Sequence, residues 1–123
     1  MFKIEGTTIH LTRGDTALFG IKAKQKDNTD YICKKDDIVR LNVFKNKDCS
    51  QIEIKKDVTI ESETDEVELS ITSNETKIGN IINRPVIYWY EIVVNPDTNA
   101  QTIIGYDDGG AKEFILYPEG GDE

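Results

Sequence analysis

Alternation of hydrophobic and polar residues runs through most of the chain and predicts short β-strands separated by polar turns. The clearest cases are Thr7–Thr12, Thr16–Lys24, Ile38–Phe44 and Glu66–Thr72, where every second side chain is apolar. Residues two apart lie on the same face of a strand, so each segment offers one face to a core and one to solvent. Gln51–Ile60 keeps this spacing with a charged interruption and fits either one strand or two short ones.

The C-terminal third of the chain predicts three further strands. Val86–Val94 is dense in β-branched and aromatic residues, which pack well on a pleated sheet, and we expect it to be a central strand. Asn95–Asn99 contains a proline and Asx residues, so the chain turns back there into Gln101–Tyr106 and forms a hairpin. A second turn, which contains two glycines, then leads to a last strand, Lys112–Tyr117.

The predicted fold class is all-β. About seven to nine short strands without a helical period indicate an antiparallel two-sheet sandwich with immunoglobulin-like or Greek-key connections. The 123 residues fit a single domain over 1–123. We expect its core to contain alternating apolar residues of several strands: Phe19, Ile21, Leu41, Val43, Leu69, Ile71, Tyr90, Ile92 and Phe114.

Two polar motifs have structural interpretations. Arg13-Gly14-Asp15 matches an adhesion tripeptide, but it falls where we expect a tight turn to close a hairpin between Thr7–Thr12 and Thr16–Lys24. Thr72–Glu75 has the spacing of a capping box, in which two residues satisfy each other's backbone N–H groups, and predicts one helical turn before Gly79.

Charge and composition limit the classes of molecule that the chain could bind. The formal net charge of −8 argues against nucleic acid, because phosphate binding needs clustered Lys and Arg. We find neither a signal peptide at the N-terminus nor an apolar run long enough to span a membrane, so we expect no membrane partner and synthesis in a cytoplasm. In that compartment Cys33 and Cys49 should be free thiols.

The residue set does not predict an enzyme. The chain has a single His, no nucleophile with a base at readable spacing and no phosphate-binding Gly-rich loop, so we expect no catalytic residues and no cofactor. Asp97, Asn99, Asp107 and Asp108 could supply oxygen ligands, but their spacing is not that of a calcium loop. We interpret them as solvated turn residues and predict no metal.

Several stretches resemble a known group of proteins. Thr8–Ala17, Asp37–Val43, Tyr88–Ile92 and Phe114–Glu119 resemble small β-sandwich proteins encoded among the tail genes of phages and prophages of Gram-positive bacteria. The chain is similar in particular to the N-terminal domain of baseplate upper proteins. The resemblance implies a virion structural protein, assembled in the bacterial cytoplasm, that binds other tail or baseplate subunits and could form a homo-oligomer.

Four apolar residues are candidate partner contacts. Phe2 and Ile4 precede the first predicted strand without a core position, and Ile104 lies beside Gly105 in a short strand. Trp89 shares a strand face with Glu91, so it serves either as core packing or as an exposed recognition residue. An exposed Trp89 would favour an alternative function, a carbohydrate- or host-surface-binding sandwich module, in which the ring stacks on a sugar.

Overall fold

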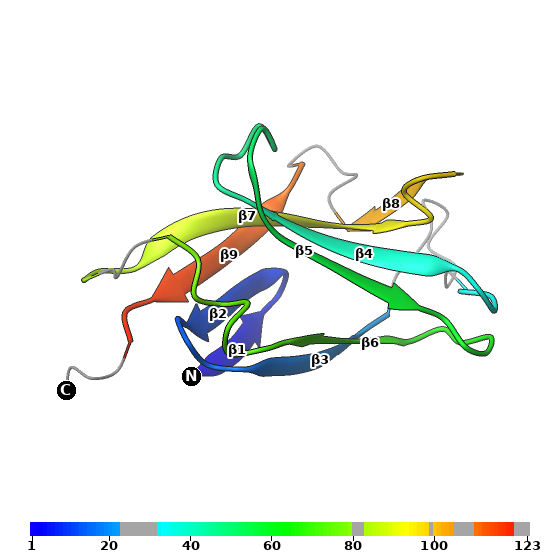
Figure 1. Ribbon diagram of the computed structural model, residues 1–123, viewed down its shortest axis with the longest axis horizontal. Coiled ribbons are helices and arrows are strands. Elements are labelled where there is room, and N and C mark those ends of the chain that lie inside the picture. Colours follow the sequence, from blue (N-terminus) through cyan, green and yellow to red (C-terminus); the bar gives the residue numbers. More distant parts are fainter. Residues whose placement is uncertain (23–31, 80–82, 99, 105–109, 120–123) are drawn as a thin grey trace.

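The computed structural model describes residues 1–22, 32–79, 83–98, 100–104 and 110–119, and for residues 101, 103 and 104 the backbone only. The described part is all-β, as predicted, and holds nine strands in two sheets (Figure 1). In chain order they are β1 (Phe2–Glu5), β2 (Thr8–Thr12), β3 (Ala17–Ile21), β4 (Ile38–Phe44), β5 (Ile52–Thr59), β6 (Val67–Ile71), β7 (Val86–Val94), β8 (Gln101–Ile104) and β9 (Lys112–Tyr117).

The larger sheet has seven strands and the smaller has two. The main sheet runs β1-β2-β9-β7-β4-β5, with β8 also paired to β7. Strands β3 and β6 pair antiparallel with each other and lie below β4, β5, β7 and β9 of the main sheet in Figure 1. Buried side chains from both sheets form one core cluster, so the two sheets share a hydrophobic interior.

Strand β7 is central, as its composition predicts. It pairs with β4 along Trp89–Val94 and with β9 along Val86–Tyr90, on its other side. Strand β8 turns back beside Ile92–Val94, which confirms the predicted hairpin. Strands β8 and β9 thus pair with successive parts of the same edge of β7. Strand β7 is long enough to hold both.

The predicted core is confirmed. All nine residues expected inside are buried, and Leu41, Leu69, Ile92 and Phe114 are fully covered. Each such side chain contributes about 1.5–3 kcal/mol of apolar burial. For these nine residues, alternation along the strands therefore identifies correctly which side chains point inward.

The expectation of a wholly antiparallel fold is wrong, because the main sheet is mixed. Strand β2 runs parallel to β9, with Ile9 opposite Phe114 and Leu11 opposite Leu116. All four of these side chains are buried on the same face. Alternation is satisfied equally by either strand direction, so the parallel pairing depends on where the chain brings β2 and not on the pattern of the strand itself.

The predicted hairpin across Arg13-Gly14-Asp15 is also wrong, since this segment carries the chain from one sheet to the other. Strand β2 belongs to the main sheet and β3 to the small one. The Arg13 guanidinium is 9% exposed and donates to the carbonyl oxygens of Lys77, Ile78 and Gly79 and to the Glu119 carboxylate. A buried arginine bound in this way is a structural clamp, not a displayed adhesion signal.

The capping-box segment forms the other half of this clamp. The Glu75 carboxylate accepts from Thr72 N–H at 2.8 Å, and Thr72 Oγ1 accepts from Glu75 N–H at 3.3 Å, which is the predicted reciprocal pair. The segment forms a turn rather than a helix. The fully buried Thr76 hydroxyl accepts from Gly14 N–H at 2.9 Å, so the turn holds the sheet-switching segment in place.

Both cysteines are free thiols, as expected. Burial raises the pKa of the Cys33 thiol, with Asp37 adding to the effect, so this thiol is kept protonated in the core. Within the described ranges no helix could cross a membrane.

Candidate protein-binding site

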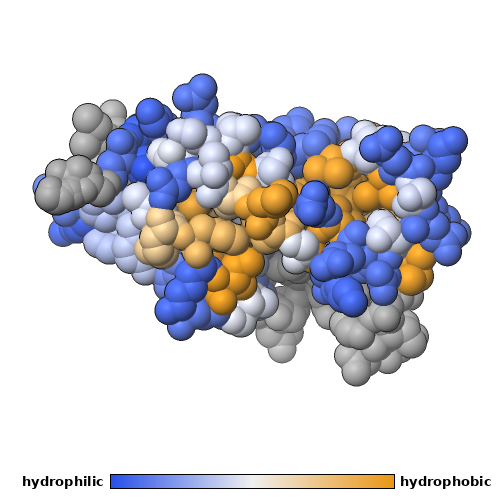
Figure 2. Space-filling model, turned by 90° about the horizontal axis from the view of Figure 1, so that it is seen from below, coloured by the Kyte–Doolittle hydropathy of each residue, from blue (hydrophilic) through white to orange (hydrophobic). Residues whose placement is uncertain are grey.

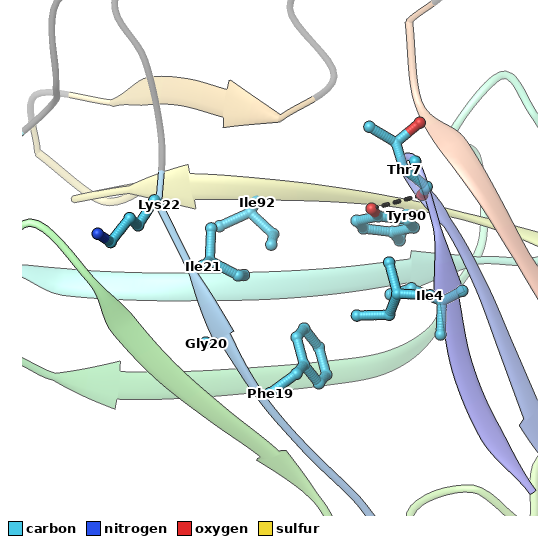
Figure 3. A pocket seen from close by; sticks show the side chains of 10 residues that line it. Ile4, Thr7, Phe19, Gly20, Ile21, Lys22, Tyr90 and Ile92 are labelled. Atoms are coloured by element: carbon cyan, nitrogen blue, oxygen red, sulfur yellow. Dashed lines mark hydrogen bonds between the residues drawn. The ribbon is translucent and has the colours of Figure 1, made fainter.

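An apolar pocket of about 220 Å³ opens between the β1–β2 turn and strand β3. Figure 3 shows β3 on one side, the β1–β2 hairpin on the other, and side chains of β7 at the back. Most of its lining residues are apolar. The full lining consists of Ile4, Gly6, Thr7, Ile9, Phe19, Gly20, Ile21, Lys22, Tyr90 and Ile92. An apolar cavity of about 150 Å³ is enough to take up benzene, so this one has room for a large apolar side chain.

The pocket follows the edge of β3 that faces away from β6. Four consecutive residues, 19–22, line it, and they include Gly20, which has no side chain. Strand β3 pairs only with β6 among the described residues. The backbone of β3 therefore borders the pocket directly, which places unpaired peptide groups beside an apolar surface.

A hydrogen bond between two distant elements shapes the pocket. The Tyr90 hydroxyl on β7 donates to the Thr7 carbonyl oxygen in the β1–β2 turn at 2.7 Å (Figure 3). Burial raises the pKa of Tyr90 to about 12, so the hydroxyl keeps its proton under ordinary conditions. Gly6 in the same turn has φ +61°, a conformation that glycine adopts at little cost.

The structure places Phe2 and Ile4 in β1, which corrects the expectation that they precede the first strand. Strand β1 pairs antiparallel with β2, with Phe2 opposite Leu11 and Ile4 opposite Ile9. The Phe2 ring packs on Phe19 with 5.6 Å between centroids, so it covers the core edge. Ile4 remains 43% exposed and lines the pocket. Of these two candidate contacts, Ile4 is the accessible one.

Polar contacts fix β1 at the edge of the main sheet. His10 Nε2 lies 2.9 Å from the Glu5 carboxylate, and His10 Nδ1 lies 2.7 Å from the Tyr117 hydroxyl. These contacts join β1, β2 and β9 on the face opposite the pocket. The hairpin that forms one wall of the pocket is thereby tied to the sheet.

Charges of opposite sign flank β3. Lys22 is exposed and lines the pocket. The Glu66 carboxylate lies over Gly20, so close that an added Cβ would be 2.5 Å from Glu66 Oε2, and Glu68 is opposite Gly20 on β6. The Lys22 side chain points away from the pocket in Figure 3, so this cation and the two glutamates all lie on the solvent-facing side of the small sheet.

Hydrophobic residues also gather on the side of the molecule where β3 and β6 lie. Figure 2, seen from below, shows them across the middle of this face with hydrophilic residues around them. Leu18 on β3 is 62% exposed and points away from the pocket, since it alternates with buried Ala17 and Phe19. Leu18 thus provides an internal comparison for any effect of the pocket.

Trp89 is adjacent to the pocket residue Tyr90 on β7 but points to the opposite face of the main sheet. It alternates with buried Tyr88 and Tyr90, is partly buried, and is opposite Phe44 on β4. The Lys47 ammonium lies 5.3 Å from the centre of the indole ring. A cation over the ring occupies a surface that a sugar would need for stacking, so this arrangement does not favour the carbohydrate-binding alternative.

The other candidate residues are only partly described. Ile104 ends β8, but its side chain lies outside the described part, as do Asn99, Asp107 and Asp108. Asp97 pairs with Arg40 at 3.2 Å. Among the described residues no cluster of three or more His, Cys, Asp or Glu could hold a metal ion.

Sequence reasoning identified one wall of this pocket and missed the rest. Ile4 was expected at a partner contact, whereas Phe19, Ile21, Tyr90 and Ile92 were expected only as core. Their inward parity is correct, but alternation along single strands carries no information about a gap between strands. The two-residue Gly6–Thr7 turn was the available signal, since it predicts that residues 2–5 fold back on β2.

No family model, curated protein or solved structure matches the chain.

Proposed function

We propose that this chain is a structural module of a phage or prophage tail, assembled in the bacterial cytoplasm, that binds other tail or baseplate subunits. The resemblance of Thr8–Ala17, Asp37–Val43 and the two C-terminal stretches motivates the class of protein. The observation that carries a protein-binding role is the apolar pocket beside the edge of β3 that no described strand pairs with. Strand edges and apolar pockets are common protein-binding features.

We propose further that the two sheets form a sandwich with immunoglobulin-like connections. Support comes from the pairing of β3 with β6 and from the order β9-β7-β4-β5 in the other sheet, since the chain leaves the main sheet for the small one at β3 and again at β6. The parallel β2–β9 pair is compatible with that arrangement, because β2 reaches the main sheet before the chain crosses to β3. Such a module offers edges, loops and outer faces for contact.

The assignment is tested by isolating tail particles from a bacterium that carries the gene, after induction of the prophage. Mass spectrometry of purified particles should find the chain at a constant ratio to the major tail protein. Absence of the chain from intact tails, together with its presence in the cytoplasm, would contradict the proposal. Self-association of the purified chain, measured by sedimentation, would show whether several copies assemble without other subunits.

A further inference from the structure

Among the described residues one edge of β3 has no paired strand, and this edge and the pocket beside it have complementary binding properties. The peptide groups along an open strand edge can pair with an incoming extended chain. The adjoining pocket can accept one of the side chains of that extended chain, since alternate residues of a strand point to the same face. Both features involve residues 19–21 of β3 and Lys22, which follows the strand.

We propose that this edge accepts an extended segment of a partner subunit as an added β-strand, with a large apolar side chain inserted into the pocket. The inserted side chain would contact Phe19 and Ile21 on β3, Ile4 on β1, and Tyr90 and Ile92 at the back. This inference rests on the proposed function, because it names the kind of partner contact that the tail module makes.

The length of the added strand is limited at one end. The Phe2 ring packs on Phe19 and joins β1 to β3 there. Pairing is therefore confined to the second half of β3, toward Lys22. The partner segment needs only a few extended residues and one anchor.

Charge sets the chemistry of that segment. Lys22 follows β3 on its solvent-facing side and favours a carboxylate on the residue next to the apolar anchor, since neighbouring residues of an added strand point to opposite faces. Glu66 and Glu68 on the solvent face of the small sheet disfavour further acidic residues on that side of the added strand. An apolar anchor followed by Asp or Glu, in an otherwise uncharged extended segment, fits the site best.

The test supplies such a strand within the full-length chain. A segment that alternates threonine with valine or phenylalanine and ends in glutamate is joined ahead of Met1 through about twelve Gly and Ser residues, a flexible length that allows either orientation. The matched control replaces two of its threonines with proline, which cannot donate to a ladder. Hydrogen exchange of the β3 amides is measured in the unmodified chain and in both fusions.

The donor fusion should slow exchange in the second half of β3 at least tenfold relative to the unmodified chain, and the proline control should not. The added substitution Ile4→Asp at the pocket rim should reduce the protection. Equal protection in both fusions, protection at β1 or β5 instead, or β3 amides that are equally protected in the unmodified chain would each overturn the inference.

Incorporation into tails separates this inference from the proposed function. With its edge already occupied, the donor fusion should enter tail particles at least tenfold less than the proline control. If both fusions enter equally, the chain is a tail protein but the strand-addition inference is rejected. If the unmodified chain itself never enters tails, the tail assignment fails, and the exchange data alone decide whether β3 accepts a strand.

Discussion

The hydroxyl of Tyr90 donates a 2.7 Å hydrogen bond to the carbonyl oxygen of Thr7, 83 positions earlier in the chain. It joins the central strand of the main sheet to the turn of the N-terminal hairpin. Because Tyr90 is 3% exposed, the bond is formed away from solvent and sets the distance between the pocket's back and one of its walls.

Tyr90→Phe should lower stability by about 1 kcal/mol at neutral pH, since one buried hydrogen bond is lost. Above pH 10 the free energy of unfolding should change less with pH for the variant than for the unmodified chain. The folded pKa of Tyr90 is raised from 10.0 to about 12, so its contribution is complete below pH 10 and is lost as pH rises toward 12. Denaturant unfolding of both proteins from pH 8 to 12 measures the difference, and parallel profiles would contradict it.

Leu69→Ala should cost roughly 2–5 kcal/mol, because Leu69 is fully buried and its truncation leaves a cavity between the sheets. Leu18→Ala is the matched control, a leucine on the paired strand β3 that is 62% exposed. It should change stability by less than about 0.5 kcal/mol. Thermal and urea unfolding compare the two, and equal losses would mean that the inward and outward faces of the small sheet are wrongly assigned.

Arg13→Ala should destabilise the chain by roughly 1–3 kcal/mol, because three carbonyl oxygens lose their charged donor. Arg13→Lys should restore little of this loss, since an ammonium cannot reproduce the planar set of guanidinium donors. The exposed Arg84→Ala is the control and should have almost no effect. Urea unfolding of the three variants would reject the clamp if Arg13→Ala and Arg84→Ala behaved alike.

Glu75→Gln should reduce the loss of stability in acid. Burial acts to raise the pKa of Glu75, but hydrogen bonds from Thr72 and the Lys56 ammonium outweigh it and hold the pKa below its usual 4.5. A lowered folded pKa adds stability above pH 4.5 that disappears as pH falls through the folded value. Unfolding free energies from pH 6 to 2 should fall less steeply for the variant, and identical slopes would contradict this role.

Alternation along the sequence predicts the faces of the strands well and their neighbours poorly. Leu41, Leu69 and Ile92 could be placed inside because apolar burial acts on each strand separately. The parallel pairing of β2 with β9 could not be predicted, since either direction buries Ile9 and Leu11 equally. The contacts made at the end of β2 are equally non-local, since Arg13 binds the carbonyl oxygen of Ile78, 65 positions away.

Strand β5 shows that alternation also fails where the pairing register between two strands shifts. Ile52 has the parity of Ile54, yet it is 51% exposed, because the β4–β5 register shifts between Val43 and Phe44. A single inserted residue moves the side chains beyond it to the other face. The pocket was unpredictable for a related reason, since it depends on the spacing between β3 and the β1–β2 hairpin.

The most direct measurement of the central claim is competitive incorporation into tail particles. Ile4→Asp places a charge at the rim of the pocket, and Leu18→Asp places the same charge on the other side of the small sheet. Both positions are exposed, so both variants should fold with unchanged circular dichroism. Co-expressed with the unmodified chain and counted by mass spectrometry in purified tails, Ile4→Asp should be depleted at least tenfold, while Leu18→Asp should match the unmodified chain. Equal incorporation of the two variants would contradict a docking role for the pocket.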